Sequence, residues 1–290
     1  MSIAASELIL SPRGRIYHLD LLPGELADTV ITVGDPGRVT TVSKHFDRIE
    51  HRASHREFIT HTGAIGSRRI SVVSTGIGPD NIDIVLNELD ALANIDFDLR
   101  SIREQKRSLS IIRLGTSGAL QADIPVDSLV ASSFAIGLDN LMHYYVQEHN
   151  PDETFILNEF IQHTRLQSSH VVPYIAEGSI RLRSAFADRM SAGITITCPG
   201  FYGPQGRVLR APIAFPQLID ALGSFSSRGH RVCNFEMETS ALYGLGKLLG
   251  HQCLSISAII ANRVRRTFST DAEAAVERMI RLSLEVITGT

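Results

Sequence analysis

An amide and a guanidinium, Gln205 and Arg207, lie two residues apart in the segment Phe-Tyr-Gly-Pro-Gln-Gly-Arg at positions 201–207. The segment follows residues 193–197, a β-branched run typical of a strand. A carboxamide can pair with an imide N–H and a carbonyl, while a guanidinium donates to a carbonyl oxygen. The two side chains therefore have the chemistry to hold a cyclic imide such as uracil. Because glycine, proline and glutamine are also common in loops, an ordinary surface turn is the alternative.

Three arginines have settings that suit an oxyanion. Arg38 closes the turn Gly-Asp-Pro-Gly-Arg, Arg56 lies in a polar segment, and Arg113 lies inside an otherwise apolar strand-like run. A charge in a buried strand costs several kcal/mol unless it meets a partner. Arg113 therefore needs an anion, and either a bound phosphate or an internal carboxylate would satisfy it.

Two glycine-bearing segments follow strand-like runs, one at Gly34 and one at residues 115–118, Gly-Thr-Ser-Gly. We expect both to be turns that present N–H and hydroxyl groups to an oxyanion at a helix start. Neither has the GxxxxGK[ST] pattern of a P-loop or the GxGxxG pattern of a dinucleotide-binding fold, and Gly76-Ile77-Gly78 is only a fragment of the latter. These patterns favour a small free phosphate over a nucleotide.

Glu236, Met237 and Glu238 lie at an expected junction between a strand and a helix. One carboxylate can accept hydrogen bonds from two vicinal ribose hydroxyls, and a methionine between two glutamates can cover a sugar face. The alternative is that both glutamates only stabilise a helix N-terminus, where acidic residues are common.

Short β-branched runs alternate with helical patterns along the chain. We expect helices after Asp80, which would cap the first of them, and over 237–249 and 272–287, whereas the polar segment 147–169 shows little periodicity. Strands are expected at 29–33, 70–74, 110–114, 128–134 and 254–260. This alternation predicts a single α/β domain over residues 1–290, with a central mixed sheet flanked by helices and ligands at the strand ends.

Composition excludes several classes of protein. The 290 residues carry a net charge of −3, so no general basic field favours nucleic acid, and 43% hydrophobic content is enough for a large core. The three cysteines have no paired spacing, which predicts burial in a reducing compartment. No apolar run has the length of a membrane span, and the N-terminal segment lacks the features of a secretory signal. We expect a cytoplasmic protein without membrane or nucleic-acid partners.

Taken together, these motifs resemble the nucleoside phosphorylase family, and most closely its uridine-cleaving members. The resemblance extends from Tyr17 to Arg263 with the motifs in the family's order. It implies a sheet partly closed into a barrel and a pentosyltransferase that cleaves a nucleoside with inorganic phosphate. Phosphate would be a co-substrate, and no cofactor is implied. A homo-oligomer is implied, either a dimer or a hexamer built from dimers, with sites shared between subunits.

The resemblance also assigns roles to individual residues. Phosphate would be bound by Gly34, Arg38, Arg113, Thr116 and a neighbouring subunit's Arg56. Ribose would be bound by Thr116, Met237, Glu238 and a neighbouring subunit's His18. The base would be bound by Phe201, Gln205 and Arg207, with Arg263 behind them ordering water. Arg113, Gln205 and Arg207 would act in catalysis by stabilising charge.

The residues after the last core strand bear on the choice of base. Purine-cleaving members of the family carry Ser-Asp there, whereas this chain has Ala261-Asn262. With Gln205 and Arg207, this difference favours reversible phosphorolysis of uridine to uracil and ribose 1-phosphate in pyrimidine nucleoside salvage. The alternatives are a purine nucleoside phosphorylase, a nucleosidase that uses water, and a noncatalytic nucleoside-binding member of the fold.

Two departures from the family pattern leave questions open. Relatives that bind a monovalent cation pair a glutamate with a serine, but here Glu57 is accompanied by Asn81. We therefore assign no metal and leave the monovalent cation open. The loop also contains Gly203-Pro204 where the more familiar order is Pro-Gly, a change that would move the base-binding residues.

Overall fold

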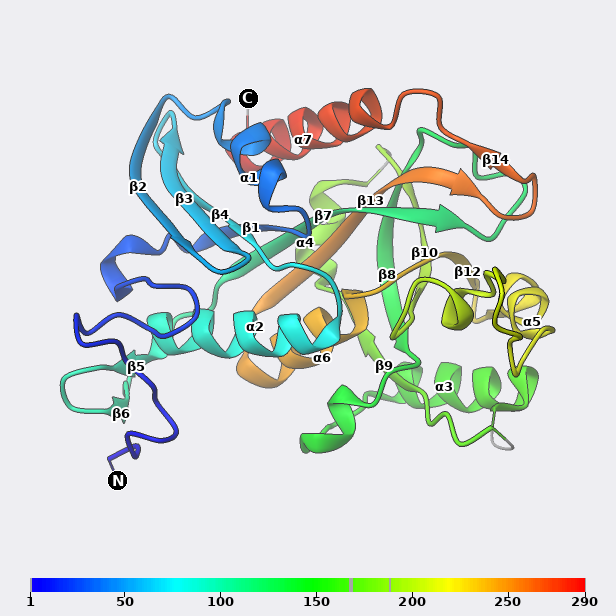
Figure 1. Ribbon diagram of the computed structural model, residues 1–290, viewed down its shortest axis with the longest axis horizontal. Helices are drawn as coiled ribbons and strands as arrows, with labels where there is room; N and C mark the ends of the chain where they lie inside the picture. Colours follow the sequence, from blue (N-terminus) through cyan, green and yellow to red (C-terminus); the bar gives the residue numbers. More distant parts are fainter. Residues whose placement is uncertain (1, 167–168, 188, 290) are drawn as a thin grey trace.

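The computed structural model describes residues 2–166, 169–187 and 189–289, which fold into one mixed α/β body (Figure 1). Its strands are β1 Thr29–Val33, β2 Arg48–His55, β3 Phe58–Ile65, β4 Arg68–Ser74, β5 Ile95–Asp96, β6 Ser101–Ile102, β7 Ser110–Ala119, β8 Leu129–Gly137, β9 Tyr174–Glu177, β10 Ser191–Thr197, β11 Ser226–Ser227, β12 His230–Glu236, β13 Gln252–Asn262 and β14 Thr267–Phe268. Its α-helices are α1 Pro36–Ser43, α2 Pro79–Asn94, α3 Pro151–Thr164, α4 Ile180–Ala185, α5 Leu218–Ser224, α6 Thr239–Leu249 and α7 Ala272–Thr288.

The main sheet combines a parallel centre with antiparallel edges. Strand β1 lies between β4 and β7 and is parallel to both, and β7 is parallel to β13. The hairpin of β2 and β3 extends the sheet beyond β4 in antiparallel fashion. Because the parallel strands β1, β4 and β7 end at the same edge, the loops that follow β1 and β4 lie beside the carboxyl half of β7.

Five strands of this sheet close into a barrel. The order β7–β13–β8–β10–β12 returns to β7 through an antiparallel pairing of Asn234 with Ala119 and Phe235 with Gly118. The register between β10 and β12 shifts between Ile194 and Thr195, a bulge of the kind that bends a strand. The prediction of a partly barrel-like mixed sheet flanked by helices is confirmed.

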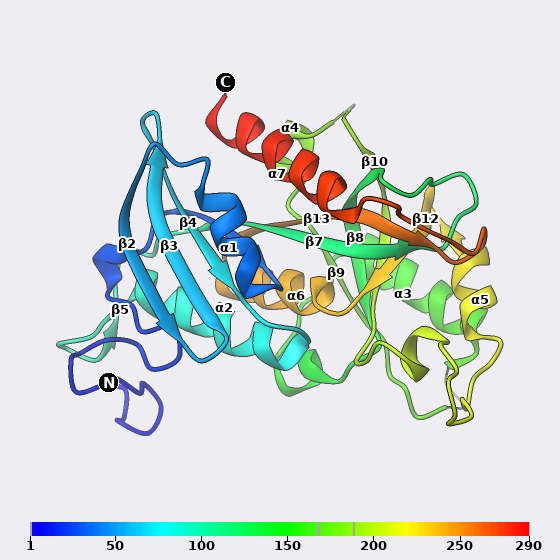
Figure 2. The same cartoon turned by 45° about the horizontal axis from the view of Figure 1, so that its top comes forward.

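Helices cover both faces of the sheet, as Figures 1 and 2 show. Helices α2 and α6 lie against one face, where Leu86 and Leu242 belong to one buried cluster. Helices α1 and α7 lie on the other face, where Val39 and Met279 belong to a second cluster. Helices α3 and α5 cover the barrel, where Phe160 of α3 meets Phe225, the residue that follows α5, edge to face. The sheet is therefore buried on both sides, which accounts for the nearly continuous apolar runs in its strands.

The predicted elements agree with the structure in most places. Strand β1 has the predicted bounds, and α7 ends one residue later than expected. Two predictions were wrong. Residues 115–118 are not a turn, because β7 continues through them and pairs with β13 as far as Ala119. Asp80 is not the cap of α2, since the cap position is Gly78.

A third difference concerns the polar segment that showed little periodicity. It contains helix α3, which begins with a reciprocal cap between Asn150 and Glu153. The helix buries Ile156 and Phe160 on one side, so its apolar stripe is narrow and was not recognised in the sequence. A short apolar stripe with one cap signal is enough when tertiary contacts supply the remaining stability.

The cysteines are buried and free, as expected. Burial raises the pKa of all three thiols, and this disfavours the reactive thiolate. Within the described residues, no helix is both long enough and apolar enough to cross a membrane.

Candidate active site

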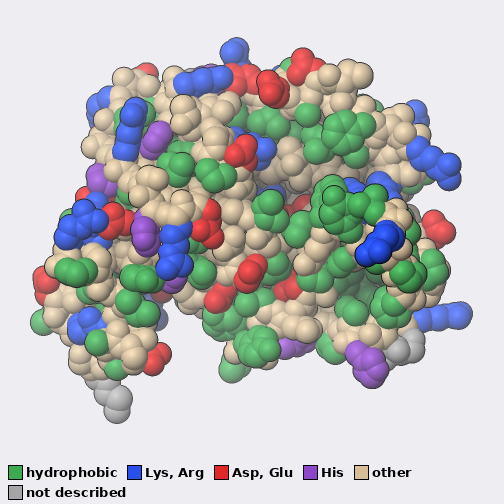
Figure 3. Space-filling view, viewed as in Figure 1, with side chains coloured by type: hydrophobic (Ala, Val, Ile, Leu, Met, Phe, Trp, Pro, Cys, Tyr) green, Lys and Arg blue, Asp and Glu red, His purple; other side chains and the backbone are tan. Residues whose placement is uncertain are grey.

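A cavity of about 750 Å³ opens where the carboxyl ends of the central strands meet the barrel. Figure 3 shows that the face seen in Figure 1 is hollowed near its centre, with basic, acidic and apolar side chains around the hollow. The cavity is lined by the loops after β1, β4, β10 and β12 and by the carboxyl halves of β7 and β13. Its volume suits a small-molecule ligand.

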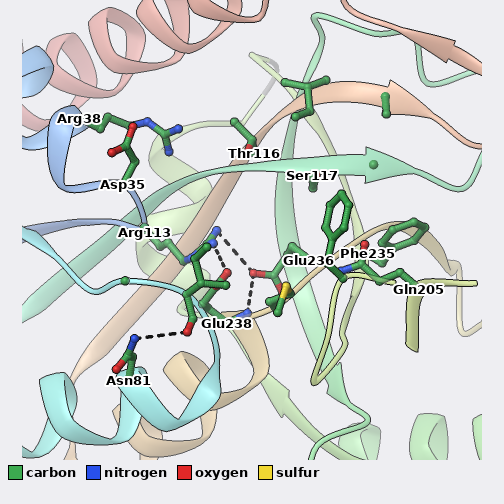
Figure 4. Close-up of a pocket in the computed structure, with 18 of the residues that line it drawn as sticks. Asp35, Arg38, Asn81, Arg113, Thr116, Ser117, Gln205, Phe235, Glu236 and Glu238 are labelled. Carbon is green, nitrogen blue, oxygen red and sulfur yellow. Dashed lines mark hydrogen bonds and ion pairs between the residues drawn. The ribbon is translucent and has the colours of Figure 1, made fainter. Parts of the chain in front are cut away.

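One end of the cavity carries the residues assigned to phosphate. Gly34, Arg38, Arg113 and Thr116 all line it, as Figure 4 shows for the labelled side chains. Arg38 Nη1 donates to the carbonyl oxygen of Leu114 at 3.2 Å, which holds the guanidinium beside β7. Burial lowers the pKa of Arg38, and the nearby Arg113 lowers it further. The two like charges at this end disfavour each other, an arrangement that an anion would relieve.

Arg113 has an internal carboxylate partner. Its Nη2 donates to Glu238, and its Nη1 lies 3.5 Å from Glu236 Oε2. Burial acts to lower the pKa of Arg113, but the carboxylates of Glu238 and Glu236 outweigh it and the pKa is raised. Nε and Nη1 have no hydrogen-bond partner among the described residues. The guanidinium is thus ion-paired inside the protein, and its Nε and Nη1 are buried without a hydrogen bond in the described part of the chain, so another acceptor reaches them only if the side chain moves.

Gly115 makes the position of Arg113 possible. A β-carbon on residue 115 would lie 1.8 Å from Arg113 Nη1, far inside van der Waals contact. The arginine side chain thus folds back across the backbone of its own strand, where only glycine leaves room for it. The sequence suggested that Gly115 served a turn, but its role is this close approach.

Glu236 and Glu238 have different surroundings. Glu236 accepts the N–H groups of Glu238 and Thr239 at 2.9–3.1 Å and the hydroxyl of Thr197 at 2.8 Å. It therefore stabilises the N-terminus of α6, as the alternative interpretation predicted. Glu238 instead accepts a hydrogen bond from Arg113 and lies in the cavity wall beside Met237. Burial raises the pKa of Glu238, with Arg113 opposing and Glu236 adding to the effect.

The loop after β4 supports Glu238 from the opposite side. Gly76 and Gly78 have φ angles of 71° and 102°, conformations that side chains rarely adopt. The N–H of Gly78 donates to Glu238 Oε1 at 2.9 Å. The two glycines fix a loop that orients the carboxylate assigned to ribose.

The far end of the cavity carries Gln205 and Arg207, the pair assigned to the base. Gln205 is 97% buried, since only 3% of its surface is exposed, and its Oε1 accepts a hydrogen bond from Arg207 Nη1. Arg207 also donates to the carbonyl oxygen of Phe201 at 2.8 Å and lies 3.7 Å from the centre of that ring. Burial lowers the pKa of Arg207, and Arg263 lowers it further. The amide and guanidinium therefore act as one held unit rather than as parts of a loose surface turn.

Arg263 lies behind this unit, outside the cavity wall. It donates to the backbone carbonyls of Gln205 and Gly206 at 3.2 and 3.3 Å. The neighbouring Asn262 is also structural, because its Nδ2 donates to the carbonyls of Gln121 and Ile124 at 2.8 and 2.7 Å. No carboxylate occupies these two positions, where the family's purine-cleaving members would place one.

His18 and Arg56 lie outside this cavity in the same chain. His18 Nδ1 is 2.7 Å from Glu88 Oε1, and the side chain is partly exposed. Arg56 is exposed and donates to the Tyr17 hydroxyl at 3.4 Å, with its guanidinium over the Tyr17 ring. One chain thus brings together every other predicted site residue at or behind the cavity, but not these two.

The residues considered for a cation, Glu57 and Asn81, both line the cavity. Asn81 Nδ2 donates to the carbonyl of Ile77 at 3.3 Å, so its amide is part of the local turn. Within the described ranges, no group of three or more His, Cys, Asp or Glu side chains could hold a metal ion.

Several residues that line the cavity are not among the predicted site residues, and two of them, Ser117 and Phe235, lie beside residues that are assigned to the substrates. Ser117 and Phe235 line the cavity between the two ends, as Figure 4 shows. The sequence predicts a turn at Ser117 and assigns no role to Phe235. Their positions in the sequence could have indicated this location. Each is next to a residue considered for the site, and each lies on a strand whose carboxyl end meets the cavity.

A profile of the phosphorylase superfamily matches residues 28–288, which covers nearly the whole fold and the cavity. An α/β sheet partly closed into a barrel, with arginines at one end of a cavity and an amide–guanidinium pair at the other, defines a nucleoside phosphorylase-like protein. The chain belongs to the phosphorylase superfamily.

Known proteins with similar sequences include uridine phosphorylases. The chain is 31% identical to the uridine phosphorylase of Thermococcus kodakarensis over 263 residues, covering 90% of this chain and 82% of that protein. It is 26% identical to the uridine phosphorylase of Haemophilus influenzae over 266 residues, covering 89% and 90%. A DeoD-type purine nucleoside phosphorylase of Bacillus cereus is 24% identical, covering 92% and 97%.

The fold is also similar to solved structures. A Trypanosoma brucei nucleoside phosphorylase described as showing uridine phosphorylase activity has a TM-score of 0.88 and 31% identity, covering 98% of this chain and all of that one. A Toxoplasma gondii purine nucleoside phosphorylase has a TM-score of 0.69 and 19% identity, covering 97% and 98%. This last likeness shows the fold alone.

Proposed function

We propose that this protein is a pentosyltransferase that catalyses the reversible phosphorolysis of uridine to uracil and ribose 1-phosphate. The observation that carries the proposal is the single cavity with Arg38 and Arg113 at one end and the Gln205–Arg207 unit at the other. Glu238 lies between them with its carboxylate in the wall. The activities of the similar uridine phosphorylases support the same reaction.

The mechanism follows from the charges at the two ends. Phosphate would be held by Arg38 and by the donors of Arg113 that have no partner, opposite C1′ of the ribose. Glu238 would turn from Arg113 to accept the ribose hydroxyls, with Met237 against the sugar. As the glycosidic bond stretches, positive charge grows on the sugar and negative charge on the base. Phosphate stabilises the first, and Arg207 with Gln205 stabilises the second.

The site would be completed by a second subunit. His18 and Arg56 lie outside the cavity of their own chain, and both carry chemistry that suits the 5′-hydroxyl and the phosphate. We propose a homo-oligomer in which these two residues enter the neighbour's cavity. Inorganic phosphate is the co-substrate, and the reaction needs no organic cofactor. The buried free cysteines fit a cytoplasmic enzyme of pyrimidine nucleoside salvage.

A substrate panel tests the proposal. Purified protein is incubated with uridine, thymidine, inosine and 5′-methylthioadenosine, each with and without phosphate, and base release is followed. Phosphate-dependent uracil release is expected. Release without phosphate would indicate a nucleosidase, release from inosine would contradict the pyrimidine assignment, and no release from any substrate would favour a noncatalytic protein.

A further inference from the structure

A row of buried polar side chains crosses four of the barrel strands and ends at the cavity. Ser132 on β8 hydrogen-bonds to Thr195 on β10 at 2.6 Å, and Thr195 donates to Asn234 Oδ1 on β12 at 2.8 Å. Asn234 Nδ2 then donates to Ser117 Oγ on β7 at 2.8 Å. Ser117 is the one member of the row that lines the cavity.

The hydrogen bonds in this row all run in one direction, from donor to acceptor, toward the cavity. A hydroxyl has one hydrogen, and Thr195 donates its hydrogen to Asn234 Oδ1. Ser132 must therefore be the donor in its hydrogen bond with Thr195. Asn234 accepts on its oxygen and donates from its nitrogen, and Ser117 accepts at the end. The Ser117 hydroxyl hydrogen has no acceptor among the described residues. Ser117 Oγ already accepts from Asn234, whereas its hydrogen is unused within the described ranges, so the unsatisfied capacity that Ser117 offers to a ligand in the cavity is a donated hydrogen bond.

The position of Ser117 indicates what it would donate to. In Figure 4 it lies between the Arg113–Glu238 group and the Gln205 end, below Thr116 on the same strand. A nucleoside with its ribose near Glu238 and its base near Gln205 would place its glycosidic bond in this middle region. The acceptor beside that bond in a pyrimidine is the 2-carbonyl oxygen.

We infer that Ser117 contacts the base by donating a hydrogen bond to this carbonyl, and that Asn234 is the positioning residue that keeps Ser117 a donor. The inference rests on the proposed function. When the C1′–N1 bond breaks, its electron pair passes to the base and the new bond forms between C1′ and a phosphate oxygen. The Ser117 hydroxyl keeps its proton and stabilises the negative charge on the carbonyl oxygen.

The first experiment removes the donor. Ser117→Ala should lower kcat/KM for uridine by about tenfold, the size of one neutral hydrogen bond, and leave the KM for phosphate unchanged. With 2-thiouridine, whose sulfur is a weaker acceptor, the difference between wild type and variant should shrink. The matched control is Ser257→Ala on β13, another fully buried hydroxyl, which has no hydrogen-bond partner among the described residues. This variant should keep wild-type kinetics.

The second experiment reverses the hydrogen bond between residue 234 and Ser117, so that Ser117 becomes the donor. In Asn234→Asp an ionised carboxylate can only accept, so Ser117 must donate to it instead of to the base. Since burial raises the pKa of such a carboxyl, the protonated form at lower pH can donate to Ser117 as the amide does. Activity relative to wild type should therefore fall as pH rises. Because ionising a buried carboxyl also lowers the stability of the fold, urea unfolding of the variant is measured over the same pH range, and the fall in activity should occur where the variant is still folded.

Three results would overturn the inference: full uridine activity in Ser117→Ala, an equal loss with uridine and 2-thiouridine, or a pH-independent loss in Asn234→Asp. Equal losses in Ser257→Ala and Ser117→Ala would also overturn it. Failure of the proposed function is distinct from these results, because wild-type protein would then release no uracil in a phosphate-dependent manner.

Discussion

Arg113 donates a hydrogen bond to Glu238, so a residue assigned to phosphate binds a residue assigned to ribose. Both side chains are 95% buried, with 5% of each exposed, and Glu236 adds a second carboxylate near the same guanidinium. Removing a charge from such a group leaves its partners buried and unpaired. One buried ion pair therefore joins the residue assigned to phosphate to the residue assigned to ribose.

Arg113→Gln should destabilise the protein strongly. Loss of one partner of a buried pair costs roughly 3 to 5 kcal/mol in the free energy of unfolding, measured by urea titration. The double variant Arg113→Gln/Glu238→Gln should recover part of this loss, because it removes one of the unpaired carboxylates. A single variant as stable as wild type would show that Arg113 is not held by these carboxylates.

Arg207→Ala should lower kcat for uridine by about a hundredfold while phosphate still binds, since the variant loses a charge at the leaving base. Phosphate binding is measured by calorimetry in the same buffer. Arg210→Ala is the control, because Arg210 is an exposed arginine of the same loop outside the cavity wall. If Arg207→Ala turned over uridine as fast as wild type, the assignment of Arg207 to the base would be wrong.

A prediction about pH concerns Glu277, which links α1 to α7. Lys44 and Arg281 hydrogen-bond to Glu277, and Lys44, the larger influence, lowers the pKa of the carboxyl to about 2. A lowered pKa in the folded state adds stability above the ordinary value of 4.5 that is lost as pH falls through about 2. Glu277→Gln should cost about 1 kcal/mol at neutral pH, because its surroundings are partly exposed.

The measurement compares urea unfolding of Glu277→Gln and wild type across acidic and neutral pH. The difference should narrow below pH 4.5 and disappear near pH 2. Glu273→Gln, on an exposed position of the same helix, should show no such dependence. A difference that stays constant with pH would mean that the Glu277 charge is not responsible.

Subunit mixing tests the shared site. Arg56→Ala and Arg207→Ala are each expected to be nearly inactive, because one lacks the contribution to its neighbour and the other lacks the base contact. Co-expressed chains should form hybrid dimers in which one of two sites is intact, giving about a quarter of wild-type activity. A mixture no more active than either variant alone would contradict a site shared between subunits.

The sequence predicted the fold where a segment carried one strong pattern. Strand β1 is a run of five β-branched residues that ends at Gly34, and its observed bounds equal the predicted ones. The prediction of a turn at residues 115–118 was wrong because Gly-Thr-Ser-Gly is a sequence that turns commonly have. Long-range pairing of β7 with β13 keeps the segment extended, and no local signal reports that partner.

For the candidate site too, the sequence predicts some features and leaves others undetermined. The types and spacing of Gln205 and Arg207 indicated a base-binding pair, and the structure places both in one cavity wall. The competition of Glu236 and Glu238 for Arg113 could not be predicted, because it depends on how the β12–α6 junction faces β7. Both glutamates line the cavity, and only the three-dimensional arrangement decides that Glu236 accepts the N–H groups at the start of α6 while Glu238 accepts from Arg113.

The identity of the sugar product tests most directly whether the protein uses phosphate to cleave uridine. Purified protein is mixed with uridine and inorganic phosphate, and the reaction is followed by phosphorus NMR together with uracil absorbance. Phosphorolysis predicts a ribose 1-phosphate signal that grows in step with uracil and is absent when phosphate is omitted. Free ribose formed at the same rate with or without phosphate would contradict it.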